Sequence, residues 1–316
     1  MSNLTFNSVQ AVSMQAFIRF KQAQGYAYGT RAGILRQFDE FLCDCSYDCA
    51  WLECDIVSEY VRSIRHLKPF SQTIMLSAIR VYSRFLNLRH PESYVVEKLP
   101  FRAKRPSRFY IFSTEEIGML MQAAGGLGPA KSIRAYTIRT LIGLLYVSGL
   151  RIGEALALNI HDLDVKERTL FVRKGKFGKD RYVPLASSSV GHLLAYVQRA
   201  NKIRKDQALF ITYKGTRLKH PTIDNTFRRL LRDCNIGSAG KQPRLHDIRH
   251  TYAVGCVSQW YEQGRNVNAL LPVLCTVMGH VKVSSTQVYL HVPDRLREQA
   301  ANRFHRHFET KIMSGE

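Results

Sequence analysis

Three segments between residues 146 and 292 combine residue types that suit chemistry at a phosphate group. Arg151 follows a glycine turn in the first segment. In the second segment, Arg249 lies three residues after His246, which is a helical spacing. Two arginines are the expected clamp for a phosphodiester, because a planar guanidinium binds two phosphate oxygens at once. The third segment carries Tyr289, whose phenol oxygen could attack phosphorus and keep the bond energy as a phosphotyrosine. The segments are residues 146–155, 245–251 and 277–292.

Phosphodiester exchange also needs groups that move protons, because the leaving 5′ oxygen must be protonated. His246 lies three residues before Arg249, so both side chains share one face of a helix. His280 precedes Tyr289 by nine residues, and Lys176 lies in a stretch with two glycines. The chain therefore contains every group that cofactor-free exchange would require.

The order of these motifs closely resembles the tyrosine recombinase (phage integrase) family. The family pattern is Gly-Leu-Arg…Glu, a hairpin lysine, His-x-x-Arg-His, Gly-His and Thr-x-x-Tyr. The match covers about 150 residues, and several ordered motifs together are more specific than any one of them. The resemblance implies a site-specific recombinase that cuts and rejoins DNA through a 3′-phosphotyrosine, with no metal, ATP or other cofactor. This activity could serve integration, excision, inversion or transposition, and the resemblance does not distinguish among them.

The resemblance assigns the nucleophile and the phosphate clamp to particular residues. It implies that Tyr289 attacks the scissile phosphate. Arg151 and Arg249 would clamp that phosphate, and Glu154 would orient Arg151.

The resemblance also implies which residues move protons and support the phosphate. Lys176 would protonate the leaving 5′ oxygen, with Lys174 and Lys179 on the same turn as alternatives. His246 would assist proton transfer, and His280 would donate a hydrogen bond to the phosphate.

Two other functions are compatible with parts of this pattern. His246 and His250 stand at the i, i+4 spacing of a zinc-hydrolase helix, with His280 as a third candidate ligand. Asp247 replaces the usual glutamate, and Arg249 would place a fixed cation beside the metal, which disfavours zinc. The second alternative is a basic DNA-binding protein without catalysis. The complete set of six motif residues argues against it.

One interval departs from the compact members of the family. Arg249 and His280 are 31 residues apart, and residues 260–272 hold the additional length. This departure disfavours close kinship with the Xer-type resolvases. It favours the integrases and transposition recombinases of mobile elements.

Apolar spacing predicts a mainly α fold with a small β-sheet. In the first hundred residues it indicates four amphipathic helices, with Asp55 and Ser71 as expected caps of the third and fourth. Three prolines and four basic residues between 90 and 106 then predict a connector. We therefore expect a helical core-binding domain over 1–105, which ends in a basic linker with its boundary near Arg105.

The region 106–316 is expected to be an α+β catalytic domain. Ser113 begins a capping box with Glu116, which predicts a helix start. Residues 169–172 and 181–183 are β-like and flank a lysine-rich turn, which indicates a hairpin. Further helices are expected over 138–146, 190–204, 222–234, 245–262 and 293–308.

The charge of the chain indicates a polyanionic partner. The sequence has 46 basic and 25 acidic residues, a formal net charge of +21. Both regions are basic: residues 1–108 carry 15 basic and 9 acidic side chains, and residues 109–316 carry 31 and 16. We expect double-stranded DNA recombination sites as the partner, with an affinity that falls steeply with salt.

The resemblance also implies protein partners. Residues 293–316 look like the C-terminal helix that packs onto a neighbouring protomer, and Leu296, Ala300 and Phe304 would form its apolar face. We therefore expect a homo-tetramer in the synaptic complex and weak association without DNA. Accessory recombination proteins are further candidate partners.

Composition indicates a soluble protein. The hydrophobic fraction is 45%, no apolar run is long enough to span a bilayer, and the first ten residues lack the order of a signal peptide. We expect a cytoplasmic, nucleoid-associated protein with no membrane partner. The seven cysteines are expected to be free thiols, and the four between 43 and 54 lack the Cys-x-x-Cys pairs of a structural zinc site.

Overall fold

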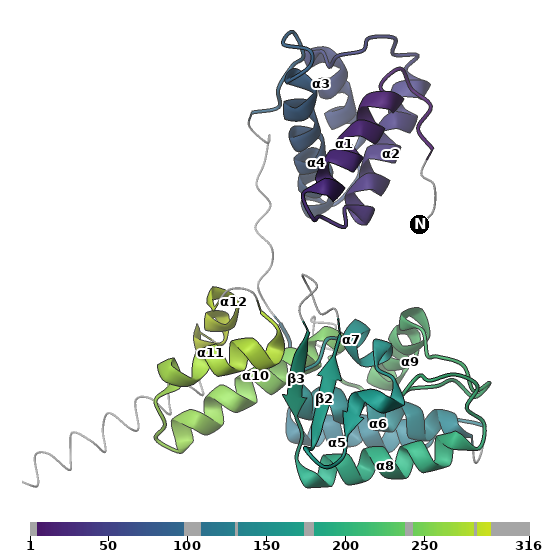
Figure 1. The fold of residues 1–316 in the computed structure, drawn as a ribbon, viewed down its shortest axis with the longest axis vertical. Helices are drawn as coiled ribbons and strands as arrows, with labels where there is room; N and C mark the ends of the chain where they lie inside the picture. Colours follow the sequence, from purple (N-terminus) through teal and green to yellow (C-terminus); the bar gives the residue numbers. More distant parts are fainter. Residues whose placement is uncertain are drawn as a thin grey trace, which may run out of the picture. The chain divides into compact units, whose positions relative to one another are not determined.

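The computed structural model describes residues 5–97, 109–129, 132–173, 180–237, 243–280 and 283–291, except for the side chain at 291. The chain divides into two compact units, Met1–Ser107 and Arg108–Glu316 (Figure 1). The boundary expected near Arg105 lies outside the described residues.

Over residues 5–97, the N-terminal unit contains four helices, as the spacing of its apolar residues predicts. They are α1 (Ala11–Ala23), α2 (Gly29–Asp44), α3 (Cys54–Ser63) and α4 (Pro69–Asn87). Met14 and Phe17 of α1 belong to one buried cluster with Leu35, Phe38 and Leu42 of α2. The apolar residues whose spacing predicted these helices therefore lie on the helix faces that form the core.

Two of the expected helix caps are wrong. Helix α3 begins at Cys54 after Glu53, so Asp55 lies inside the first turn. Helix α4 begins at Pro69, so Ser71 also lies inside its helix. Proline suits the first turn, because its φ is already helical and its missing N–H is not needed there. This preference places the start of α4 ahead of the serine.

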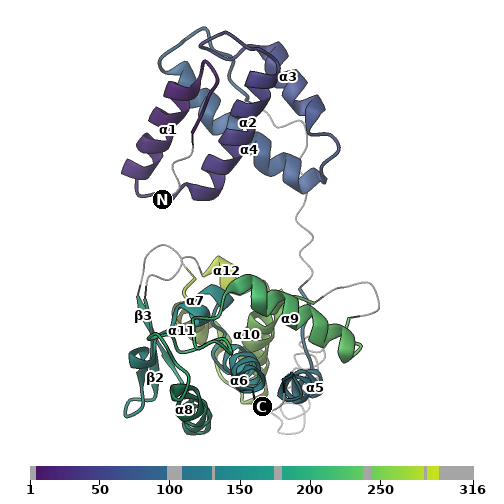
Figure 2. The same cartoon turned by 90° about the vertical axis from the view of Figure 1, so that its right-hand side faces the viewer.

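The second unit is mostly helical and is organised around α6. Its helices are α5 (Thr114–Gly125), α6 (Ile133–Ser148), α7 (Ile152–Ala157), α8 (Ser187–Asn201), α9 (His220–Asp233), α10 (Leu245–Glu262), α11 (Val267–Met278) and α12 (Ser284–Gln287), with short 3-10 helices η1 (Ile160–Asp162) and η2 (Val288–His291). Helix α6 packs against α5, α8 and α10, and in Figure 2 it lies between α5 and α8. Nine of its residues are buried, which explains its apolar sequence.

A small antiparallel sheet covers part of this unit. Its strands are β1 (Leu163–Asp164), β2 (Thr169–Val172) and β3 (Arg181–Pro184), in that spatial order. The predicted hairpin is confirmed, because β2 pairs with β3 and the buried residues Leu170 and Val183 lie opposite each other. The lysine-rich turn between the strands, residues 174–179, lies outside the described residues.

Several helix limits follow the local signals in the sequence. The capping box of Ser113 and Glu116 starts α5, and α10 has the predicted limits of Leu245 and Glu262. Helix α6 ends at Ser148, and the next residue, Gly149, adopts the left-handed conformation common after helix ends. The helix predicted over 293–308 lies outside the described residues.

Tyr289 is part of an apolar cluster separate from the main core. The cluster is formed mainly by α10, α11 and η2, with Val257, Leu271 and Met278 among its buried members. Phe109 and Ile111, which precede α5, pack against it. The nucleophile candidate is thus held by apolar packing.

Among the described residues, no helix combines the length and the apolar character needed to cross a membrane.

Candidate active site

The structure brings five of the six predicted site residues together on packed elements of the second unit. They are Arg151 before α7, His246 and Arg249 in α10, His280 after α11 and Tyr289 in η2. Lys176 and its alternatives Lys174 and Lys179 lie outside the described residues.

The turn at Gly149 positions both arginines of the expected clamp. Its φ is +60°, and a Cβ at this position would lie 2.2 Å from Cδ1 of Tyr252 in α10. Only glycine permits this approach, since it has no Cβ. The turn directs the chain to Arg151 two residues later, and its carbonyl accepts a hydrogen bond from Nη1 of Arg249 at 2.6 Å.

Arg249 is a fixed, buried cation. Its side chain is only 2% exposed, and its Nη2 donates to the carbonyl of Met278 at the end of α11. Burial and the nearby charge of Arg151 lower the pKa of its guanidinium to about 10. It therefore stays protonated at neutral pH.

Arg151 is held from two directions. Its Nη1 donates to Glu154 at 2.7 Å and its Nη2 donates to the carbonyl of Gly279 at 2.9 Å. Its backbone N–H also donates to Glu154, at 3.0 Å. Both ends of the side chain are thereby fixed, as the expected role of Glu154 requires.

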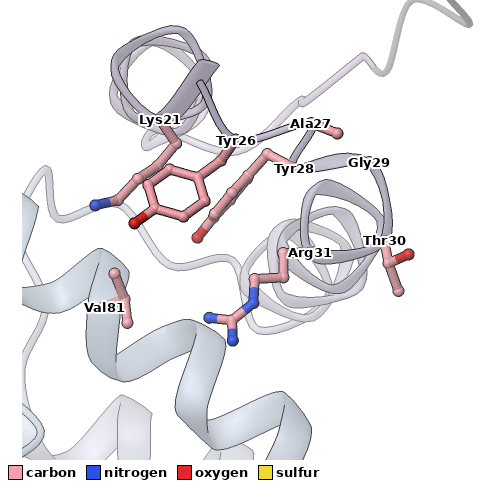
Figure 3. Close-up of a pocket in the computed structure, with 8 residues that line it drawn as sticks. All are labelled: Lys21, Tyr26, Ala27, Tyr28, Gly29, Thr30, Arg31 and Val81. Atoms are coloured by element: carbon pink, nitrogen blue, oxygen red, sulfur yellow. The ribbon is translucent and has the colours of Figure 1, made fainter. Parts of the chain in front are cut away.

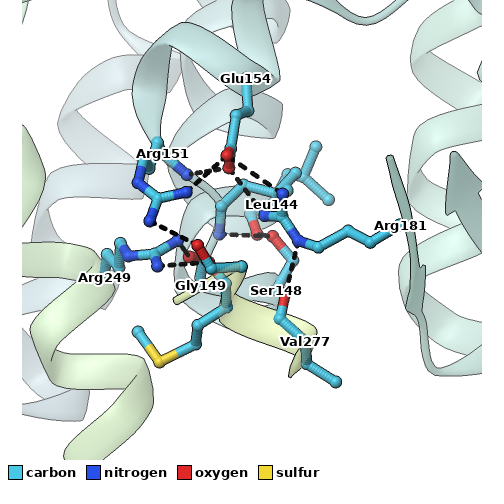
Figure 4. A network of polar contacts seen from close by, with 11 residues as sticks. Leu144, Ser148, Gly149, Arg151, Glu154, Arg181, Arg249 and Val277 are labelled. Carbon is cyan, nitrogen blue, oxygen red and sulfur yellow. Dashed lines mark hydrogen bonds and ion pairs between the residues drawn. The ribbon is translucent and has the colours of Figure 1, made fainter. Parts of the chain in front are cut away.

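Arg181 is a contributor to the site that the motifs did not identify. It lies on β3, and its guanidinium donates to both oxygens of Glu154 and to the carbonyl of Val277. Figure 4 shows Arg151 and Arg181 approaching Glu154 from opposite sides. Burial alone would raise the pKa of Glu154, but Arg181 and Arg151 hold it at about 2. The carboxylate therefore bridges the hairpin and the clamp as an anion.

The Tyr289 hydroxyl is buried and hydrogen-bonded. The residue is 2% exposed, and its Oη lies 2.9 Å from Nδ1 of His250. Burial raises the pKa of the phenol, whereas the charges of Arg249 and Arg151 oppose this rise. Both arginines thus act electrostatically at the oxygen predicted to attack phosphorus.

His250 is the second residue of the site, after Arg181, whose role the sequence motifs did not indicate. Its ring stacks on Phe109, with centroids 4.5 Å apart and planes at 20°, and it meets the ring of His246 edge-on at 4.8 Å. Burial, and next the neighbouring His246, lowers its pKa to about 4. The imidazole is therefore neutral at pH 7.

His280 and His246 lie beside the pair formed by His250 and Tyr289: His280 is next to the Tyr289 ring, and His246 is next to the His250 ring. His280 Nδ1 lies 2.8 Å from the Thr286 hydroxyl, and its ring lies parallel to that of Tyr289 at 6.4 Å. Burial and the charges of Arg249 and Arg151 lower the pKa of His280 to about 4. His246 is exposed on α10. It can therefore reach a molecule that binds outside the helix.

The side chains that the structure describes do not form a metal site. Among them, no three His, Cys, Asp or Glu residues are grouped as metal ligands would be. The Nδ1 atoms of His250 and His280 contact hydroxyl groups instead. The zinc alternative therefore gains no support from this geometry, and neither does metal binding by the free thiols between 43 and 54.

The N-terminal unit has a pocket of about 530 Å³ between the end of α1 and the start of α2. Figure 3 shows the side chains of Lys21, Tyr26, Tyr28 and Arg31 around one space. The Lys21 ammonium lies 5.9 Å from the centre of the Tyr26 ring. Two cations beside two aromatic rings suit contacts with nucleic acid.

Sequence comparisons place this geometry in a known family. The model of the phage integrase family matches residues 111–295. A Sinorhizobium fredii protein named as an integrase/recombinase, y4rB, is 32% identical over 311 residues, which cover 95% of this chain and 98% of that one. The tyrosine recombinase XerC of Chlamydia trachomatis serovar L2 is 32% identical over 241 residues, which cover 73% and 70% of the two chains.

Solved structures share the fold. The Tn1549 transposon integrase in complex with transposon right end DNA has a TM-score of 0.65 at 15% identity, and the match covers 93% of this chain and 98% of that one. A lambda integrase dimer bound to a core site has a TM-score of 0.63 at 15% identity, with 87% and 96% covered. The chain belongs to the phage integrase family and is a site-specific tyrosine recombinase.

Proposed function

We propose that the protein cuts and rejoins double-stranded DNA at recombination sites, with Tyr289 as the nucleophile of a 3′-phosphotyrosine intermediate. The observation that carries this proposal is electrostatic. Burial raises the pKa of the Tyr289 phenol, and the charges of Arg249 and Arg151, both close to this oxygen, oppose that rise. Fixed cations beside a nucleophilic oxygen would also stabilise the charge that develops on a phosphate in the transition state.

The two guanidinium groups have the donors to clamp that phosphate. Each has five N–H donors, and the contacts described above use two in Arg151 and two in Arg249. Phosphate binding therefore does not require these anchoring bonds to break. His280 would donate a hydrogen bond to the same phosphate, and His246 would assist proton transfer.

Lys176 is the proposed proton donor to the leaving 5′ oxygen. It lies in the sequence between β2 and β3, and Lys174 and Lys179 in the same segment are the alternatives. Arg181 at the start of β3 binds Glu154, which in turn binds Arg151. This connection couples the base of the hairpin to the clamp.

DNA would be held by both parts of the chain. Residues 1–105 would form the core-binding domain and residues 106–316 the catalytic domain. The net charge of +21 and the pocket lined by Lys21, Tyr26 and Arg31 support binding to phosphates. The structural match to a transposon integrase supports a mobile element as the source of the sites. The C-terminal segment would join protomers into a synaptic tetramer, to which accessory recombination proteins could bind.

The test of this proposal is formation of a covalent protein–DNA adduct. Duplexes selected from a random library by binding to the full chain would be nicked beside the cleavage site, so that the released strand diffuses away and traps the adduct. We expect an adduct with the wild type, also in excess EDTA, because the proposed chemistry uses no metal. Tyr289→Phe should bind the same duplex and form none. The matched control is Tyr182→Phe, at a tyrosine exposed on β3. An adduct with Tyr289→Phe would contradict the proposal.

A further inference from the structure

The hydroxyl of Tyr289 already has a hydrogen-bond partner that could receive its proton. Nδ1 of His250 lies 2.9 Å from Oη, within the range required of a general base. His280, by comparison, directs its Nδ1 to the Thr286 hydroxyl, and His246 contacts the His250 ring edge-on. Within the described residues, His250 is therefore the histidine in direct contact with the nucleophile.

The surroundings of His250 suit a base that is neutral before the reaction and cationic after it. The charged and titratable groups around it are His246, Asp247, Arg249, Arg244, His280 and Tyr289. Burial is the main cause that lowers the pKa of His250, followed by His246, and the two arginines add to the effect, so the imidazole is unprotonated and Nδ1 can accept. A bound scissile phosphate would offset the positive charge and make the ring more basic.

Phe109 supports the same function from the other side of the ring. Its face lies parallel to His250 with centroids 4.5 Å apart, and its own ring is 5.9 Å from that of Tyr289. An aromatic face attracts a cation, so Phe109 would stabilise the imidazolium once it forms. It also restricts rotation of the ring, which keeps Nδ1 directed at the phenol.

We propose that His250 accepts the proton of the Tyr289 hydroxyl during strand cleavage and returns it during religation, with Phe109 as the residue that positions its ring. This inference rests on the proposed function, because it assumes that Tyr289 is the nucleophile.

The step is balanced in both directions. In cleavage, Oη forms a bond to phosphorus while its proton moves to Nδ1 of His250. The bond from phosphorus to the 5′ oxygen breaks, and that oxygen takes a proton from the lysine of the hairpin. In religation, a 5′ hydroxyl attacks the phosphotyrosine, and the imidazolium returns its proton to the departing Oη. No oxidant, reductant or metal takes part.

The first experiment separates proton transfer from mere positioning. The Oδ1 atom of an asparagine can occupy nearly the position of Nδ1 and accept the same hydrogen bond, but it cannot carry the proton away. His250→Asn should therefore form the covalent adduct at least about 100-fold more slowly than the wild type, the usual minimum for loss of a general base. His192→Asn, on the exposed surface of α8, is the matched control. A His250→Asn rate equal to that of the wild type would overturn the proposal.

Chemical rescue gives an independent measurement should the asparagine disturb packing. His250→Ala leaves space that free imidazole can enter. Adduct formation by this variant should be slow and should increase with the concentration of neutral imidazole. Folding of both variants would be checked by thermal unfolding and by binding to the intact duplex. If folded His250→Ala showed no response to imidazole, His250 would not be the proton acceptor.

A modified substrate identifies which oxygen His250 serves. Sulfur in place of the scissile 5′ oxygen leaves without a proton, so it restores variants that lack the general acid. The slow rate of His250→Asn should persist on this substrate, whereas Lys176→Ala should recover. Recovery of His250→Asn on this substrate would overturn the proposal. A slow rate that persists in His246→Asn and not in His250→Asn would also overturn it. Absence of any wild-type adduct would refute the proposed function, a result distinguishable from both.

Discussion

The carboxylate of Glu154 binds the guanidinium of Arg181 through both oxygens, at 3.1 and 2.8 Å. The two residues are 27 positions apart, and each side chain is only 8% exposed. Because Glu154 also binds Arg151, a single anion fixes two cations from different elements. The clamp is therefore held by a buried ion network that includes the base of the hairpin.

Glu154→Gln should weaken both folding and cleavage. The substitution leaves two guanidinium groups facing each other without the anion between them, and breaking a buried ion pair costs about 3–5 kcal/mol. The free energy of unfolding from urea titrations should fall by an amount in this range, and adduct formation should fall with it. Asp224→Asn, in the surface pair with Arg228, should cost at most about 1 kcal/mol. Equal effects of the two substitutions would contradict the importance of the network.

Gly149→Ala should destabilise the second unit because of both space and conformation. A left-handed residue other than glycine costs about 1–2 kcal/mol, and the new Cβ would also overlap the Tyr252 ring. Gly153→Ala is the matched control, since a Cβ there meets nothing within 4 Å and its φ is not positive. It should be neutral or stabilise the protein by up to about 1 kcal/mol. Thermal unfolding of both variants checks this, and a stable Gly149→Ala protein would show that the turn tolerates a side chain.

Arg249→Lys should lose most cleavage although it keeps the charge. The guanidinium of Arg249 donates along two fixed directions to the carbonyls of Gly149 and Met278. A lysine ammonium cannot make both of these contacts and also bind a phosphate with two parallel hydrogen bonds. We expect adduct formation to fall by at least about 100-fold, as for removal of one preorganised donor. Arg229→Lys, exposed on α9, is the control substitution. A wild-type rate for Arg249→Lys would show that the clamp is assigned to the wrong residue.

Stability should depend on pH through the histidines of the site. The pKa of His250 and that of His280 are both lowered from the usual 6.5 to about 4. Between these values the unfolded chain binds more protons than the folded one, so the free energy of unfolding should decrease as the pH falls from 6.5 to 4. Urea titrations at several pH values measure this slope. His280→Asn should reduce it, and an unchanged slope would exclude His280 as a contributor.

Local patterns predicted most of the elements but not all of their limits. The limits of α10, the capping box of Ser113 and the pairing of β2 with β3 depend on residues close in sequence, and these predictions are confirmed. The expected caps Asp55 and Ser71 are wrong, because a polar side chain near a helix start does not by itself determine which residue begins the helix.

The partners of the motif residues could not be predicted, because they come from distant parts of the chain. Arg181 could have been any surface arginine of a strand until the fold placed it against Glu154. Phe109 and His250 are far apart in sequence, and the motif His-x-x-Arg-His gives no indication that its second histidine contacts Tyr289. Such contacts depend on tertiary packing, whereas the motifs report only residue type and spacing.

The most direct test of Tyr289 as the nucleophile is to identify the residue that carries DNA in the trapped adduct. The chain has 15 tyrosines, so detection of an adduct alone does not show which one reacts. Wild-type adduct would be digested with a protease and a nuclease, and the peptide that retains a nucleotide would be sequenced by mass spectrometry. We predict a nucleotide linked through its 3′ phosphate to Tyr289. A nucleotide on any other residue, or linked through a 5′ phosphate, would contradict it.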